Sequence, residues 1–210
     1  MRIREKLFST TLYLLRMQGE CPVHELENGF TLKRLEEREI DAVSIAHRDR
    51  KTVEDRLAAG DVAYWVDHNG RCMNIQWYSV HDYFVWDIRS LVTFTPGSSY
   101  LYDGFTDPEY RGKGINRASL SCLIRDAGLL RNGSIFSLTQ KSNPMGWGFL
   151  EKFGFQRVAS ITLQQIPPIR RYIAEFQHKS ISRIQFMKRH NEPMRLDLDR
   201  VRFLGKGESS

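Results

Sequence analysis

Residues 111–116 read Arg-Gly-Lys-Gly-Ile-Asn and place two glycines, two cations and an amide within six positions. Strand-like residues 100–106 precede this run, and apolar residues at helical spacing from Leu120 to Ala127 predict a helix after it. The first turn of a helix has unpaired N–H groups and the positive end of the helix dipole. Glycine lets the backbone approach an anion closely. The run therefore predicts a site for a diphosphate-bearing ligand at a strand-to-helix junction.

A second motif begins at Asn143-Pro144, which predicts the start of a short helix. The helix is expected to run to Phe153 and to end at Gly154. Both motifs thus fall on helix ends, where a polar side chain or a bare backbone is available to a ligand.

The remaining elements alternate between strands and helices. Asn69-Gly70 lies between two apolar runs and predicts a tight hairpin of strands 62–66 and 71–80. Further strands are expected at 29–36, 100–106, 134–139 and 155–166, and helix-prone residues at 37–59. Residues 2–18 are expected to form a helix.

These elements predict three parts of the chain. Residues 1–28 form an N-terminal helical extension, 29–166 the main domain, and 167–210 a basic C-terminal extension that ends in a disordered tail. The apolar stretch near the N-terminus is too short to cross a bilayer, so no transmembrane segment is expected.

The composition is that of a globular protein with a basic surface. The 210 residues carry a net charge of +6, which favours anionic partners. Nucleic acid is not expected, because the basic residues are scattered rather than gathered in one patch. The three cysteines and six histidines are dispersed, which predicts no disulfide framework, no metal site and a reducing, cytoplasmic location.

Taken together, the two motifs resemble those of the GCN5-related N-acetyltransferase (GNAT) superfamily. The family pattern Arg/Gln-x-x-Gly-x-Gly/Ala matches residues 111–116, and its Asn-helix-Gly-Phe signature matches 143–155. The resemblance spans about residues 29–166. It implies an α/β (α+β) fold with a mixed, mostly antiparallel central sheet flanked by helices. It also implies acetyl-CoA, or another acyl-CoA, as acyl donor and a small-molecule amine as acceptor, and it leaves a homodimer open.

The resemblance assigns cofactor-binding roles residue by residue. The backbone of the loop would hold the diphosphate, with Lys113 adding charge, and the strand end would pair with pantetheine. Asn143 would reach pantetheine or the loop. The cofactor-binding residues expected in this way are Phe105, Thr106, Arg111, Gly112, Lys113, Gly114, Ile115, Asn116 and Asn143.

Two positions depart from the family pattern. Asn116 replaces the last Gly or Ala of the loop, where it crowds a phosphate but can donate a hydrogen bond. Leu150 stands where the family often has the Tyr that protonates the leaving thiolate. Asp103 and Tyr102 are the predicted catalytic residues, on opposite faces of their strand unless a bulge intervenes.

Three functions are compatible with the sequence. The first is an acyl-CoA-dependent N-acyltransferase in which the amine attacks the thioester directly. The second is a catalytically silent acyl-CoA-binding sensor or assembly module. The third is a binding module that uses the basic segment 169–202.

His81, Asp82 and Asp87 are alternative bases or surface residues. One aromatic group either lines an acceptor pocket or packs in the core: Trp77, Tyr78, Tyr83, Phe84 and Trp86.

Overall fold

A computed structural model describes residues 8–44, 48–131, 133–166, 169–176, 179–186 and 193–204. Within it the chain forms two compact units. The unit that contains residues 18–80 and 97–135 is called the loop unit, because residues 111–116 belong to it. The other unit contains 1–17, 81–96 and 136–210 and is called the terminal unit.

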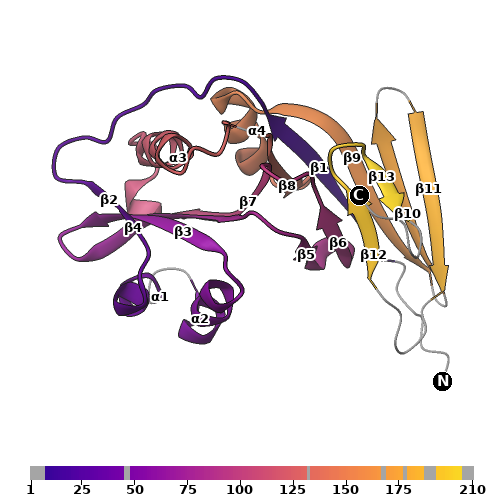
Figure 1. The fold of residues 1–210 in the computed structure, drawn as a ribbon, viewed down its shortest axis with the longest axis horizontal. Helices are drawn as coiled ribbons and strands as arrows, with labels where there is room; N and C mark the ends of the chain where they lie inside the picture. The colour runs from indigo at the N-terminus through magenta and orange to yellow at the C-terminus, as the bar shows by residue number, and fades with distance from the viewer. Residues whose placement is uncertain are drawn as a thin grey trace. The chain divides into compact units, whose positions relative to one another are not determined.

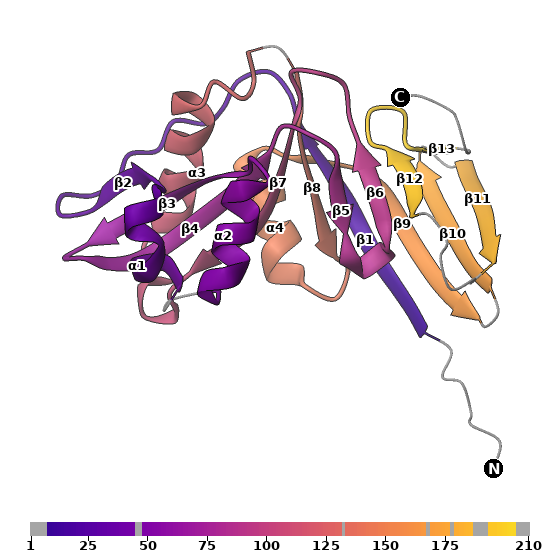
Figure 2. The same ribbon diagram turned by 60° about the horizontal axis from the view of Figure 1, so that its bottom comes forward.

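The loop unit is built on a four-stranded antiparallel arrangement in the order β7-β4-β3-β2. The strands are β2 (Thr31–Arg34), β3 (Val62–His68), β4 (Arg71–Ser79) and β7 (Ser99–Thr106). Helix α3 (Ile115–Asp126) lies on one face, and α1 (Ile40–Ser44) and α2 (Arg50–Ala58) lie on the other (Figures 1 and 2). The short 3-10 helices η1 (Glu37–Glu39) and η3 (Pro108–Tyr110) complete this unit.

The β3–β4 hairpin forms where Asn-Gly predicts it. Asn69 and Gly70 have φ angles of 53° and 79°, the left-handed conformations that a two-residue hairpin turn requires. Asp67 accepts a hydrogen bond from the Gly70 N–H at 2.8 Å and so closes the turn. This prediction is confirmed.

The terminal unit contains two sheets. The larger has the order β11-β10-β9-β1-β8, and the smaller has the order β13-β12-β6-β5. The larger consists of β1 (Phe8–Met17), β8 (Ile135–Gln140), β9 (Gln156–Ile166), β10 (Ile169–Phe176) and β11 (Lys179–Phe186). The smaller consists of β5 (Tyr83–Val85), β6 (Ser90–Thr93), β12 (Met194–Asp197) and β13 (Arg202–Leu204), with η2 (Trp86–Ile88) between β5 and β6.

Helix α4 (Pro144–Phe153) has the predicted ends. Asn143 accepts a hydrogen bond from the Gly146 N–H, which caps the N-terminus. Gly154 has φ 118° and ends the helix in a conformation that favours glycine. The molecule is thus a mixed α/β protein whose strands are mostly antiparallel and flanked by helices, as predicted; the β12–β6 pair is parallel.

The helix predicted for residues 2–18 is wrong over its described part, because Phe8–Met17 forms strand β1. Strand β1 pairs with β9 on one side and lies next to β8 on the other. Leu12 and Leu14 are buried, and so are Leu15 and Met17, because the register with β9 shifts between Leu14 and Leu15. This shift interrupts the period of two, and the apolar run can then be mistaken for a helix.

The C-terminal segment also adds strands to the terminal unit. Strand β10 pairs with β9 and with β11 over its length, and β12 pairs with β6. Tyr172 of β10 is fully buried and hydrogen-bonds Ser90 of β6. Both terminal segments therefore extend sheets rather than stand apart, and the disordered tail predicted from Gly205 lies outside the described residues.

Candidate acyl-CoA-binding site

A bulge interrupts the pairing of β7 with β4 at Asp103 and Gly104. Tyr102 is opposite Trp77 and Phe105 is opposite Ile75, so two residues of β7 face the single residue Gln76. Asp103 has a left-handed φ of 48°. A Cβ on Gly104 would lie 2.5 Å from the Gln76 Oε1, so a larger residue at this position would displace the end of the Gln76 side chain.

Two arginines hold the Asp103 carboxylate. Arg48 donates to it from Nε at 2.9 Å and from Nη2 at 2.5 Å. Arg56 forms a second ion pair at 2.7 Å. The Asp103 carboxylate is thus engaged by two cations, which the sequence alone did not indicate.

Tyr102 also has an engaged polar group. Its ring is buried, and its hydroxyl donates to the Asp61 Oδ2 at 2.7 Å. The Arg56 guanidinium carbon lies 5.1 Å from the Tyr102 ring centroid and 5.0 Å from that of Trp77. Because Arg56 contacts both Tyr102 and Asp103, the bulge brings the two predicted catalytic side chains to one cation instead of opposite faces.

The turn between β7 and α3 leaves open space at both glycines. Asp107 accepts a hydrogen bond from the Glu109 N–H and so starts η3. Gly112 and Gly114 have φ angles of 78° and 76°, and a Cβ added at either would meet no atom within 4 Å. Gly114 is the N-cap of α3 and supplies no side-chain acceptor. The first-turn N–H groups of this 12-residue helix are thus available to a ligand.

Two exposed cations flank this opening. Arg111 donates from Nε to the Thr106 carbonyl at 3.2 Å, which leaves the rest of its guanidinium exposed. The Lys113 ammonium lies 4.5 Å from the Tyr110 ring centroid. Open backbone donors beside two cations are the chemistry that a diphosphate group requires.

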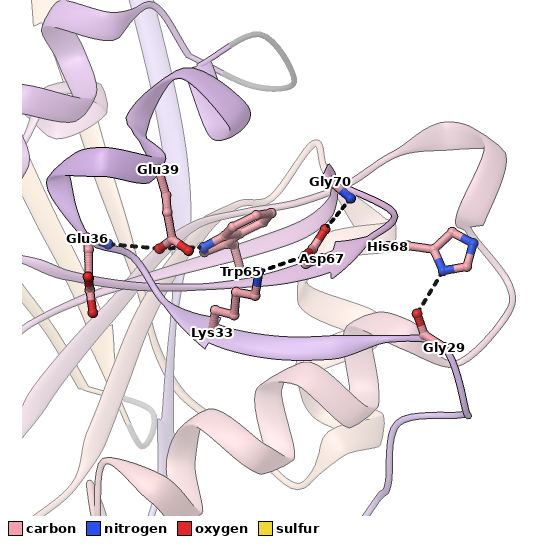
Figure 3. Close-up of polar contacts among 8 residues, drawn as sticks. All are labelled: Gly29, Lys33, Glu36, Glu39, Trp65, Asp67, His68 and Gly70. Carbon is pink, nitrogen blue, oxygen red and sulfur yellow. Dashed lines mark hydrogen bonds and ion pairs between the residues drawn. The ribbon is translucent and has the colours of Figure 1, made fainter.

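The β2–β3 edge supports the loop through stacked rings. Phe30 stacks on His68 with centroids 4.6 Å apart, and Tyr110 meets both rings at 6.1 Å. Figure 3 shows His68 hydrogen-bonded to the Gly29 carbonyl, and Lys33 paired with Asp67. Tyr110 is therefore held against the β2–β3 edge by its ring contacts, and Lys113 lies over the Tyr110 ring.

The strand end and the first turn of α3 meet in a group of side-chain amides. Asn74 donates from Nδ2 to the Phe105 carbonyl at 2.7 Å and to the Thr106 hydroxyl at 2.8 Å. The Asn116 Oδ1 accepts from Asn74 at 3.2 Å and also from Gln76. Ile115 is instead a buried core residue, so only its backbone can serve a ligand.

Asn143 lies in the terminal unit, and its Oδ1 is used to cap α4. Leu150 is buried on the same helix, with no titratable group at the position of the family Tyr. Phe105, Thr106 and residues 111–116 thus lie together within the loop unit, whereas Asn143 does not, and the cofactor-binding role of all of them stays a prediction.

The alternative bases have partners in the terminal unit. Asp82 pairs with Arg195 at 3.3 Å, and Asp87 accepts from Gln140 at 2.8 Å. In the aromatic group, Trp77 and Tyr78 are buried, which supports the core reading for these two. Trp86 instead is 76% exposed and contacts Phe84 edge to face.

Several residues of the site were not predicted from the sequence. Arg48, Arg56 and Asp61 come from loops and a helix far from β7 in sequence, and no local pattern marks them. Asn74 and Gln76 did carry a signal, because these two polar residues alternate with apolar residues in the middle of β4.

The model of the Acetyltransferase (GNAT) family matches residues 81–155, a segment that contains both motifs. The predicted resemblance to the GNAT superfamily is confirmed. The matched GNAT segment is shorter than the predicted 29–166 and includes β7, the glycine loop, α3 and α4. No curated protein matches the chain in a comparison of sequences.

Solved structures show the GNAT fold at low sequence identity. One is a protein from Novosphingobium aromaticivorans that is assigned to the GNAT acetyltransferases, with 19% sequence identity and a TM-score of 0.53. The aligned region covers 75% of this chain and 64% of that protein. A Drosophila protein is 11% identical with the same TM-score, with coverage of 53% of its length and 83% of this chain. The chain therefore spans less than two thirds of these two proteins.

Among the described residues, no helix is both long and apolar enough to cross a membrane. Within that same part of the chain, no group of three or more His, Cys, Asp or Glu side chains is placed to hold a metal ion.

Proposed function

We propose that the protein is an acyl-CoA-dependent N-acyltransferase, and most simply an N-acetyltransferase that uses acetyl-CoA. The observation that carries this proposal is the opening at Gly112 and Gly114, where both glycines have positive φ and open space at the N-terminus of α3. The match of the surrounding segment to the GNAT family model supports the same ligand.

In this proposal the loop backbone from Arg111 to Asn116 binds the diphosphate, while Arg111 and Lys113 supply positive charge. The strand end at Phe105 and Thr106 binds the pantetheine arm. Acyl-CoA supplies an activated thioester to the site. A primary amine is the acceptor, and we infer direct attack by the amine without a covalent enzyme intermediate.

Proton transfer is assigned to Asp103 and Tyr102 as a proposal. Asp103 would act as general base beside two cations, since the Arg48 and Arg56 guanidiniums both contact its carboxylate. An Asp103→Asn variant tests this role. A fall in kcat of about 100-fold or more with unchanged acetyl-CoA affinity would support it. A fall in stability alone would assign Asp103 to structure.

A second candidate is an acyl-CoA-binding module without turnover. Leu150 favours it, because this buried apolar residue cannot protonate a leaving thiolate. The engaged groups of Asp103 and Tyr102 point the same way. A CoA thiol is fairly acidic, so the lack of a donor is compatible with turnover as well.

Release of the CoA thiol distinguishes the two candidates. Purified protein is incubated with acetyl-CoA and a panel of primary amines, and free thiol is measured over time. Amine-dependent release identifies an enzyme, and Leu150→Tyr should then raise kcat by supplying a proton donor. Binding of acetyl-CoA without release for any amine supports the silent module and contradicts the transferase proposal.

A further inference from the structure

The amides of Asn74, Gln76 and Asn116 form a network behind the glycine loop. Asn74 and Gln76 project from β4, and Asn116 projects from the first turn of α3. Asn74 is fully buried and Gln76 is 3% exposed. Buried amides need hydrogen-bond partners, so the donors and acceptors around them determine which way each amide is turned.

The Phe105 carbonyl fixes the orientation of this network. A backbone carbonyl only accepts, so the end of Asn74 that lies 2.7 Å from it must be the Nδ2 amide. This donor also faces Asn116, and the atom of Asn116 that meets it is therefore the Oδ1 acceptor. Gln76 donates to the same oxygen. Two donors thus hold Asn116 in one of its two amide orientations.

With Oδ1 turned toward β4, the Asn116 Nδ2 is the other end of the amide. No partner for this nitrogen is found among the described residues. Because side chains on a helix lean toward its N-terminus, the Asn116 amide is directed to the end of α3 that carries the open N–H groups. Residue 116 is also the second residue of α3, within the first turn.

We propose that Asn116 donates a hydrogen bond from Nδ2 to a diphosphate oxygen of the acyl donor. Asn74 and Gln76 are the positioning residues that keep the donor end of Asn116 turned to the ligand. The inference rests on the proposed function. It gives the side-chain amide of Asn116 a specific role in binding the acyl donor. The family pattern has a Gly or Ala at this position.

Binding of CoA and of pantetheine tests the role of Asn116, because pantetheine lacks the diphosphate. Asn116→Ala should raise the Kd for CoA about 10-fold, the range for a hydrogen bond to a charged group. Asn116→Asp keeps an acceptor for Asn74 and Gln76 but turns a carboxylate to the diphosphate, so a rise of about 100-fold or more is expected. Pantetheine binding should change less than about 2-fold in both variants.

A charge control accompanies the Asp variant. Gln156→Glu adds the same charge at an exposed position of the terminal unit and should leave CoA binding unchanged. Equal CoA affinity in wild type and Asn116→Asp would overturn the inference. So would an equal loss of CoA and pantetheine binding, since that result indicates general damage to the site.

A double-mutant cycle tests the positioning residues. Gln76→Glu removes a donor and places a carboxylate beside the Asn116 Oδ1, which favours the flipped amide. We expect a rise in the Kd for CoA of about 10-fold in the wild-type background and less than about 2-fold in Asn116→Ala. Equal effects in both backgrounds would overturn the positioning role. Thermal unfolding of each variant verifies that the fold is kept.

Failure of this inference is distinct from failure of the proposed function. If wild-type protein binds neither CoA nor acetyl-CoA, the proposed function is wrong and the inference is wrong with it. If wild type binds CoA and the Asn116 variants bind it equally well, only the inference is wrong.

Discussion

Asp103 shows how strongly the surroundings of one residue constrain its chemistry. Its carboxylate is 16% exposed and is shared by Arg48 and by Arg56, which is itself 16% exposed. Arg56 also lies against the rings of Trp77 and Tyr102. A carboxylate in this position neutralises a cation that is largely removed from water, and the loss of a partner for such a cation is costly.

We expect Asp103→Asn to lower the free energy of unfolding by about 1–3 kcal/mol, because Arg56 loses its counter-charge while it stays mostly covered. Denaturant unfolding followed by circular dichroism measures the change. Asp82→Asn is the matched control, since its ion pair with Arg195 is exposed and should change stability by less than about 0.5 kcal/mol. Equal effects of the two variants would contradict this account of Asp103.

Cys72 is the other residue with a testable environment. Burial raises the pKa of its thiol to about 12, against an ordinary value of 9.0. The thiol is therefore protonated in the folded protein at pH values where the unfolded chain has already lost the proton. The contribution of Cys72 to stability is present below about pH 9 and is lost as the pH rises toward about 12.

In native protein at pH 8, iodoacetamide should modify Cys21 and Cys122, which are partly exposed, and should leave Cys72 unmodified. Burial also raises the pKa of Cys21 and of Cys122, so their reaction will be slow. Mass spectrometry of peptides reports each site, with urea-unfolded protein as control. Modification of all three thiols at one rate in native protein would disprove the buried placement of Cys72.

Among the helices and strands, those that begin or end at a characteristic residue could be predicted from the sequence. The β3–β4 turn, the ends of α4 and the junction of β7 with α3 all depend on Gly, Asn or Pro at a fixed position. Strand β1 and the C-terminal strands have no such marker, since their state is decided by partners far away in sequence. For the same reason the glycine loop could be predicted, whereas the Arg48–Arg56–Asp103 contacts could not.

Two glycines of different elements should respond in opposite directions to alanine. A Cβ on Gly133 would lie 2.5 Å from the Gly97 backbone, close to where Ser99 at the start of β7 donates a hydrogen bond to the Ser134 carbonyl. We expect Gly133→Ala to destabilise the protein by about 1–3 kcal/mol. Gly148 is inside α4 with no atom near its added Cβ, so Gly148→Ala should stabilise by about 0.5–1 kcal/mol.

Thermal unfolding of the two glycine variants beside wild type measures both changes. A stabilised or unchanged Gly133→Ala would show that the two backbones are not in close contact at this point. A destabilised Gly148→Ala would show that α4 has a neighbour at this position.

At the scale of the whole molecule, the sequence predicted the GNAT resemblance and the mixed, mostly antiparallel fold, while the placement of the terminal segments required the structure. The net charge of +6 favours an anionic donor without identifying one. The proposed acyl donor is inferred instead from local features, namely two open glycines, a helix N-terminus without a side-chain cap and two exposed cations. Among the described residues of the loop unit, no comparable feature identifies the proposed amine acceptor.

The central claim, that residues 111–116 bind acyl-CoA, is tested most directly by calorimetric titration of acetyl-CoA into wild type, Gly114→Trp and Gly19→Trp. Gly19 is the matched control, because its φ of 81° and its open surroundings resemble those of Gly114, with φ 76°. We predict binding to wild type and Gly19→Trp and its loss in Gly114→Trp, where the indole fills the opening. Absence of binding to wild type, or equal binding to all three proteins, would contradict the account.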